Sequence, residues 1–203
     1  MSESSIQIVE KPDWVSWEEI HDVLWEAHRQ NREKGIIMRN PSLSGEEIKN
    51  IIGSNGMFFL AIDGKKIVGT LALIAKTGKK WYCQGDYGYV GFGAVLPEYS
   101  GQGVYQNLYQ QTESAAKNRG LNVLIIDTNE KNSRILKIMK QDGYVSVGYI
   151  ALKDHFNIVI AKWLNKCPYP LWYIKFRFLL SKMYKKTRFK MVSGKGRTKR
   201  FGI

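Results

Sequence analysis

The stretch from Val95 to Tyr105 is the part of the sequence that most restricts the fold. It reads Val-Leu-Pro-Glu-Tyr-Ser-Gly-Gln-Gly-Val-Tyr and follows a long, largely apolar segment. Pro97 has no backbone N–H to give to a sheet, so a strand must end there. Gly101 and Gly103 accept backbone angles that other residues avoid, and a helical pattern begins directly after them. The chain is therefore expected to pass from a strand through a tight glycine loop into a helix.

Apolar patterns on both sides of this loop predict a mixture of strands and helices. Asp63-Gly64 between two apolar runs is a strong hairpin signal, and Ser16 and Ser44 each begin a capping box. With one parallel crossover among hairpins, the fold is expected to be α/β (α+β mixed): a mixed, mostly antiparallel sheet of about seven strands with helices on both faces. The strands are expected at 6–9, 57–62, 66–75, 81–95, 123–126, 146–152 and 157–163, and the helices at 16–35, 44–52, 103–119 and 133–141.

The positive charge is confined to the end of the chain. Of 31 Lys and Arg residues, thirteen lie in 160–203, which contains no Asp or Glu; the other 18 balance the 18 acidic residues before it. The two prolines of Cys167-Pro-Tyr-Pro170 interrupt any helix or paired strand. The sequence therefore predicts a domain over 1–165 and a basic extension over 166–203.

The extension is predicted to form a basic amphipathic helix followed by an unstructured segment over 193–200. Its apolar residues recur at helical spacing, while Lys175, Lys182 and Lys186 form a separate stripe. The apolar stripe comprises Trp172, Phe176, Leu179, Leu180 and Met183. Three interpretations remain open: packing on the domain or on a second copy of the chain as a homodimer, contact with an anionic membrane surface, and contact with nucleic acid. The last is disfavoured, because no nucleic-acid-binding motif accompanies it.

Other features narrow the class of protein. Cys83 and Cys167 are the only cysteines, and no Cys/His cluster has the spacing of a metal site, so no metal is expected. The N-terminus lacks the features of a signal peptide, and no apolar run reaches the length of a membrane span. A cytoplasmic protein is predicted, with peripheral membrane association left open by the basic extension.

The glycine loop is suited to binding an anion. A helix that begins directly after it presents unpaired N–H groups and the positive end of its dipole to the loop. A pyrophosphate is the natural ligand of such a site. The spacing fits neither a Walker A loop, which needs Lys-Ser/Thr, nor a dinucleotide loop, which needs a third glycine. A ligand-free turn before an ordinary helix is the alternative.

The loop resembles motif A of the GCN5-related N-acetyltransferases, Gln/Arg-x-x-Gly-x-Gly/Ala after a strand that ends in Val-x-Pro. Gly101 and Gly103 match its two small residues, whereas Glu98 and Ser100 stand where many members carry basic or amide side chains. Downstream, the segment from Asn132 to Tyr144 resembles motif B, Asn-x-x-Ala-x-x-Leu-Tyr-x-x-x-Gly-Phe. The order of the predicted elements also resembles that fold.

The resemblance implies an acyl-CoA-dependent N-acyltransferase that passes an acyl group, most simply from acetyl-CoA, to a primary amine of a small molecule or sugar precursor. The backbone N–H of Val95 would bind the thioester carbonyl, and the 25–44 segment, with His28, Asn31, Arg32 and Met38, would line the acceptor site. The implied cosubstrate-binding residues are Val95, Leu96, Gly101, Gln102, Gly103, Val104, Tyr105 and Asn132.

The catalytic acid and base are not evident. Met139 stands where the family carries a Tyr that acts as the general acid, and a Met side chain can donate no proton. Met139→Tyr is therefore expected to leave activity similar or to raise it modestly. Tyr89 and Asp127 are the candidate catalytic residues, by their places on two neighbouring strands; packing and capping roles are the alternatives. A buried Cys83 is expected to be inert. The alternative function is a catalytically silent acyl-CoA-binding module whose basic tail binds a membrane or partner.

Overall fold

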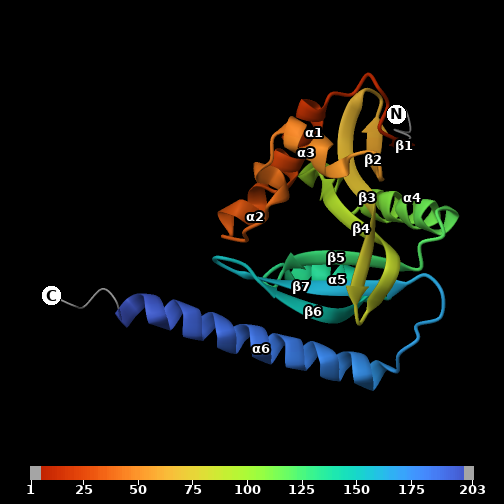
Figure 1. Cartoon of the computed structure of the whole chain (residues 1–203). Helices are drawn as coiled ribbons and strands as arrows, with labels where there is room; N and C mark the ends of the chain where they lie inside the picture. Colours follow the sequence, from red (N-terminus) through yellow and green to blue (C-terminus); the bar gives the residue numbers. More distant parts are fainter. Residues whose placement is uncertain (1–5, 199–203) are drawn as a thin grey trace. The chain divides into compact units, whose positions relative to one another are not determined.

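The computed structural model describes the backbone of residues 6–198 and the side chains of residues 6–189. Its strands and helices follow one another in the predicted order, with a short helix and two 3-10 turns added (Figure 1). The strands are β1 (Gln7–Glu10), β2 (Gly56–Asp63), β3 (Lys66–Lys80), β4 (Cys83–Val95), β5 (Val123–Asn129), β6 (Val145–Ala151) and β7 (Phe156–Trp163). The helices are α1 (Trp17–Ala27), α2 (Arg29–Glu33), η1 (Asn40–Ser42), α3 (Gly45–Ile52), η2 (Pro97–Tyr99), α4 (Val104–Asn118), α5 (Ser133–Gln141) and α6 (Leu171–Thr198).

The strands confirm the mixed, mostly antiparallel sheet. Their hydrogen-bonded order is β1-β2-β3-β4-β5-β7-β6. Neighbours pair antiparallel from β1 through β4 and again in β6–β7, whereas β4 and β5 pair parallel. The chain divides into two compact units, the first over 1–126 and 163–165 and the second over 127–162 and 166–203.

In the first unit, helices cover both faces of β2, β3 and β4 (Figure 1). Alternate residues of a strand point to opposite faces, and here both sets are apolar. One face packs against α1 and α3 through Ile20, Leu24 and Ile48, all fully buried. The other face lies under α4: a side chain at Gly69 would meet Leu108 and Val104 of that helix at 3.1 Å. The helices on both faces were predicted from the sequence.

The first helical segment is broken where the sequence predicted one helix up to Gly35. Ser16 caps α1 through the predicted capping box with Glu19. The helix ends at His28, whose backbone leaves the helical region, and α2 follows as a separate short helix from Arg29 to Glu33. The break places His28 at a corner, where its ring is buried rather than displayed on a helix surface.

In the second unit, α6 packs along β6 (Figure 1). Ser181 accepts a hydrogen bond from the backbone N–H of Tyr149, and the rings of Phe178 and Phe189 pack against Tyr149 and Phe156. The Tyr149 hydroxyl donates to Glu130, and Lys186 lies 3.3 Å from the same carboxylate. The α6 helix is therefore part of the packing of its unit.

The face of α6 that packs is not the stripe predicted from the sequence. Ile174 is buried at 3% exposure, and Phe178 and Phe189 are half-buried. All five residues of the predicted apolar stripe are exposed instead. The helix also runs to Thr198 and so includes part of the 193–200 segment that was expected to be unstructured; residues 199 and 200 lie outside the described residues. Within the described residues, no helix combines the length and apolar character needed to span a bilayer.

We expect Ile174→Ala to lower the free energy of unfolding by about 2–4 kcal/mol, because it leaves a cavity under α6. The matched control is Leu179→Ala on the same helix, which removes an exposed side chain and should change stability by less than about 0.5 kcal/mol. Urea denaturation followed by circular dichroism measures both values. Equal losses in the two variants would contradict the assignment of the packed face.

Candidate acyl-CoA site

A bulge interrupts β4 just before the glycine loop. Thr70 pairs with Ala94 and Ala72 with Gly91, so Leu71 faces two residues of β4, Phe92 and Gly93. Phe92 has a φ of 53°, the one positive value at a non-glycine position among the described residues. Left-handed backbone at such a residue costs roughly 1 kcal/mol. The buried hydroxyl of Thr70 donates to the Phe92 carbonyl at 2.7 Å and holds this conformation.

The backbone N–H of Val95, which follows the bulge, is not directed toward β3. The Leu96 N–H donates to the Val68 carbonyl at 2.9 Å. Successive residues of an antiparallel strand direct their N–H groups to opposite sides, so the Val95 N–H is directed away from β3. On that side, the described β4–β5 ladder contains only Gly88 and Tyr89 of β4. The Val95 N–H therefore takes no part in the pairing of β4 with β3.

Gly101 and Gly103 shape the entry to α4. Both have left-handed backbone, with φ of 85° and 77°, and a Cβ on either would meet no heavy atom within 4 Å. Gly103 is the N-cap of α4, and no side chain caps that turn. A helix start without a side-chain cap retains N–H groups for an anion, and the dipole of this 15-residue helix adds to the attraction. The open glycines, the helix start and the Val95 donor fit the pyrophosphate and thioester of an acyl-CoA.

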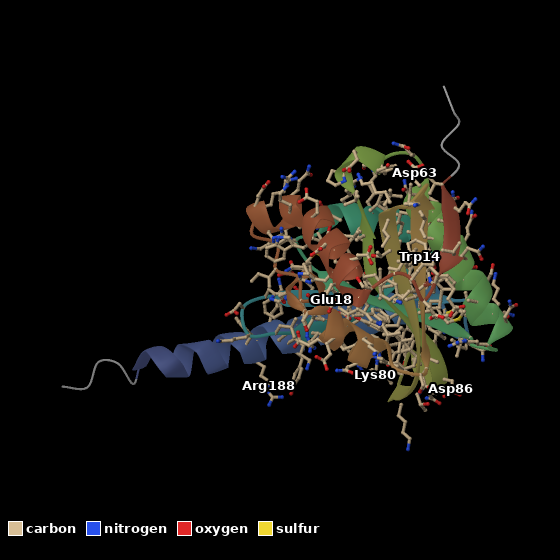
Figure 2. The ribbon with its side chains drawn as sticks, turned by 90° about the horizontal axis from the view of Figure 1, so that it is seen from above. Trp14, Glu18, Asp63, Lys80, Asp86 and Arg188 are labelled. Atoms are coloured by element: carbon tan, nitrogen blue, oxygen red, sulfur yellow. The ribbon has the colours of Figure 1, made fainter. Side chains whose placement is uncertain are left out.

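Glu98 does not leave an uncompensated negative charge beside the loop. Its carboxylate lies 2.9 Å from the Lys66 ammonium at the start of β3. The Lys66 hydrogen bond lowers the pKa of Glu98, and the reciprocal contact raises the pKa of Lys66. Tyr99 donates to Asp63, which is labelled in Figure 2 and ends β2, at 2.9 Å, and this bond raises the pKa of Tyr99. The hairpin turn thus anchors the loop at two adjacent residues.

Gln102 adds a further contact within the loop. Its side-chain amide donates to the Glu98 carbonyl at 3.0 Å, while the side chain itself stays exposed. Leu96 and Val104 on either side of the loop are buried, at 5% and 2% exposure. The predicted residues Val95, Leu96, Gly101, Gln102, Gly103, Val104 and Tyr105 therefore lie on one continuous strand–loop–helix segment of the first unit.

His28 lies against the bulge and is neutral in the folded protein. The Asn31 amide lies 3.2 Å from Nδ1, and the same amide nitrogen contacts the Met38 sulfur at 3.3 Å. The pKa of His28 is lowered to about 4, chiefly because burial penalises the charged ring; the Gly93 backbone acts in the opposite direction. Nε2 nevertheless makes no hydrogen bond of normal geometry. The structure thus brings together three of the residues expected to line the acceptor site.

Arg32, the fourth of those residues, makes packing contacts, and so do Tyr89 and Cys83. Arg32 stacks on the Trp25 ring, 3.6 Å from its centroid, and donates to the Trp25 carbonyl. Tyr89 packs against the core of the first unit with Lys76 4.4 Å above its ring. Cys83 is buried, and burial raises the pKa of its thiol, which disfavours a nucleophilic thiolate.

Asp127 and Asn132 belong to the second unit, and each has a contact there. Asp127 accepts from the Asn157 amide at 2.6 Å. Asn132 is the N-cap of α5: its oxygen accepts from the Ile135 N–H at 3.4 Å, and its amide lies 3.5 Å from the Thr128 hydroxyl. The capping role of Asn132 was available from the sequence, since Asn before a helical pattern is a common N-cap.

Met139 is fully buried on α5, at 0% exposure. A Tyr at this position would need more volume and a partner for its hydroxyl. The expected effect of Met139→Tyr on activity stays a prediction, and the burial of the side chain adds an expected loss of stability. Among the described residues, no group of His, Cys, Asp and Glu side chains could hold a metal ion.

A family model and several solved structures are similar to this chain. The model of the acetyltransferase (GNAT) family matches residues 17–144, which contain both glycines and α5. No curated protein is similar enough in sequence to count as a relative.

Among solved structures, an aminoglycoside 6'-acetyltransferase type Ii is similar with a TM-score of 0.61 and 17% identity, over 80% of this chain and 99% of that one. A GNAT-family acetyltransferase from Staphylococcus aureus Mu50 has a TM-score of 0.61 and 20% identity, over 79% and 100%. The ribosomal-protein-S18-alanine N-acetyltransferase from Escherichia coli has 0.59 and 14%, over 82% and 98%. At these identities the structures establish a shared fold.

The depressed pKa of His28 predicts a pH-dependent stability. Between pH 6.5 and about 4 the unfolded chain binds a proton that the folded ring does not, so the contribution of the neutral ring is complete above pH 6.5 and is lost as the pH falls toward 4. The shift corresponds to about 3 kcal/mol. We expect His28→Gln to lose correspondingly less stability over this range, as measured by urea denaturation at several pH values. Parallel curves for the two proteins would refute the buried neutral ring.

Met139→Tyr is expected to lower the free energy of unfolding by about 1–3 kcal/mol, because it overpacks a filled core position. Met139→Leu, which nearly conserves volume, is the control and should cost less than about 1.5 kcal/mol. Thermal and urea denaturation measure both. A Tyr variant as stable as wild type would contradict the expectation that position 139 has no room for a larger side chain.

Proposed function

Because the chain belongs to the GNAT acetyltransferase family, we propose that it transfers an acyl group, most simply acetyl from acetyl-CoA, to a primary amine of a small molecule or sugar precursor. The observation that carries the proposal is the start of α4, where two left-handed glycines with open Cβ positions precede a helix without a side-chain cap. Amino-sugar acceptors are favoured by the similarity to aminoglycoside 6'-acetyltransferases.

In this proposal the first turn of α4 and the loop before it hold the pyrophosphate. Backbone N–H groups supply the contacts, so the absence of a basic residue at position 98 removes no bond that the loop itself makes. Acetyl-CoA supplies an activated acyl group whose leaving group is a thiolate. Gly101 and Gly103 let the backbone approach the phosphates because neither carries a Cβ.

The Val95 N–H would donate to the thioester oxygen. A donor held in place by the neighbouring Leu96–Val68 hydrogen bond needs no rearrangement to oppose the negative charge that develops on that oxygen as the amine attacks. The fixed strand end also holds the thioester for the attacking amine, and such positioning supplies much of the rate of a two-substrate reaction.

Tyr89 and Asp127 are the proposed candidates for accepting the proton of the amine. One carboxylate oxygen of Asp127 is held by Asn157, an arrangement that orients a proton acceptor. No acid is required at the sulfur, since a thiolate leaves readily. Asp127→Asn and Tyr89→Phe would each change one of these groups with little change in shape.

The first test uses two glycines at opposite ends of α4. Gly103 and Gly120 both have positive φ, 77° and 68°, and both have open space at the Cβ position. We expect Gly103→Glu to abolish the rise in melting temperature that acetyl-CoA causes, because the carboxylate enters the phosphate site. Gly120→Glu, which carries the same strain and charge, should retain it. A retained shift in Gly103→Glu would disprove this placement of the cosubstrate.

The second test separates an enzyme from a silent acyl-CoA-binding module. The protein is mixed with acetyl-CoA and a panel of amines and amino sugars, and the release of free thiol is followed. Amine-dependent release is the expected result, and its loss in Gly103→Glu but not in Gly120→Glu would tie it to the same site. A melting-temperature shift without thiol release from any amine would favour the silent module.

A further inference from the structure

The α6 helix has a second apolar face opposite the one that packs on β6. We define this outer face by its exposed residues, of which Trp172 at 69% and Met183 at 66% are the most exposed. Helical spacing places the outer face roughly half a turn away from Ile174 and Phe178. Its members are Trp172, Phe176, Leu179, Leu180, Met183 and Tyr184.

The number of exposed apolar side chains on this face is larger than scattered single exposures would give. Scattered exposed side chains are ordinary, whereas a contiguous stripe of six along three turns indicates an interaction surface. The packed face accounts for the attachment of α6 to its own unit through Ile174, Phe178 and Ser181. The outer face is therefore not required for that packing, and a different partner must explain it.

The charges that border the outer face indicate the chemistry of that partner. Exposed Lys175 lies on one border and exposed Arg188 on the other, and the Arg188 side chain extends away from the helix in Figure 2. The chain from 160 to 203 contains thirteen basic residues and no acidic one. An apolar stripe with aromatic rings between basic borders is the pattern of helices that lie in the headgroup region of anionic membranes.

We propose that the outer face of α6 binds the surface of a bilayer containing anionic phospholipids, with the helix parallel to the membrane plane. The aromatic and aliphatic side chains would enter the headgroup boundary, while Lys175 and Arg188 contact lipid phosphates. Pairing of α6 with α6 of a second copy fits less well, because it would bring two basic helices together with no acidic residue to offset them. This inference does not depend on the proposed acyl transfer.

The experiment is cosedimentation of the full-length protein with vesicles of phosphatidylcholine alone and of phosphatidylcholine with phosphatidylserine, at low and high salt. We expect binding to the phosphatidylserine vesicles at low salt and about tenfold or greater weakening at high salt, because exposed charges are screened. The double variant Phe176→Ser with Leu179→Ser should weaken binding by about tenfold or more. Trp14→Ser, which removes an exposed aromatic residue of the first unit, is the control and should bind as wild type.

A charge pair of variants tests the borders separately. Lys175→Glu with Arg188→Glu should reduce binding to phosphatidylserine vesicles by about tenfold or more. Lys34→Glu with Lys49→Glu makes the same change of net charge at exposed positions of the first unit and should have a much smaller effect. Unchanged circular dichroism and melting temperature confirm that every variant is folded.

Three outcomes would overturn the proposal. Equal, salt-independent binding to both kinds of vesicle would remove the anionic lipid from it. Absence of vesicle binding, together with a dimer in sedimentation that Phe176→Ser with Leu179→Ser dissociates, would make the outer face a contact between copies. Absence of vesicle binding with RNA binding that the same variants abolish would assign the face to nucleic acid.

Discussion

The bulge at Phe92 and Gly93 is the constraint on which the candidate site depends. Without the extra residue, β4 would continue its pairing with β3 in unbroken register up to Pro97. With it, the strand bends locally, and the described pairs of β4 with β5, at Gly88 and Tyr89, lie before the bend. The Thr70 hydroxyl and the buried His28 ring both contact or face this segment from neighbouring elements. The candidate site thus begins at the backbone of this one strand.

The loop after the bulge shows how a departure from a family pattern is offset locally. Glu98 would repel a pyrophosphate if its charge stood alone. Lys66 neutralises it across the hairpin turn, and Asp63 of the same turn holds Tyr99. Two interactions from β2 and β3 thus fix a loop whose own contacts are few. In the proposed function, phosphate binding rests on backbone groups, which a side-chain substitution does not remove.

Much of the fold was predictable because its signals are local. Asp63-Gly64 between apolar runs specified the hairpin, and the Ser16 and Ser44 capping boxes specified two helix starts, all as the structure has them. The bulge was not predictable, since Phe92 carries no preference for left-handed backbone and is held there by a partner 22 residues away. Nor was the break at His28, which depends on burial of the ring against another element.

The α6 helix shows a different limit. Its residues are apolar on two opposite faces. The sequence indicated the larger stripe and left open whether that stripe packs on the domain or a second copy, contacts a membrane or contacts nucleic acid. The choice of Ile174 and Phe178 depends on the shape of β6 and β7, which spacing does not contain. In the candidate site, the succession of strand, loop and helix from Val95 to Tyr105 was predictable, as was the N-cap role of Asn132, whereas the contact of Asp127 with Asn157 required the structure.

The bulge also changes which residues of β4 direct their side chains toward α1. Before the bulge, the side chains of odd-numbered residues of β4 face α1, as Tyr89 does opposite Ile74. After it, the side chains of even-numbered residues face α1, as Ala94 does opposite Thr70. Deleting one residue at 92–93 would leave Leu71 opposite a single residue of β4, with Ala94 still opposite Thr70 and Val95 still opposite Gly69. The Val95 N–H would keep its direction away from β3, but the strand would lose the local bend that the extra residue produces. A change of length that a surface loop absorbs would here straighten the strand that leads into the glycine loop.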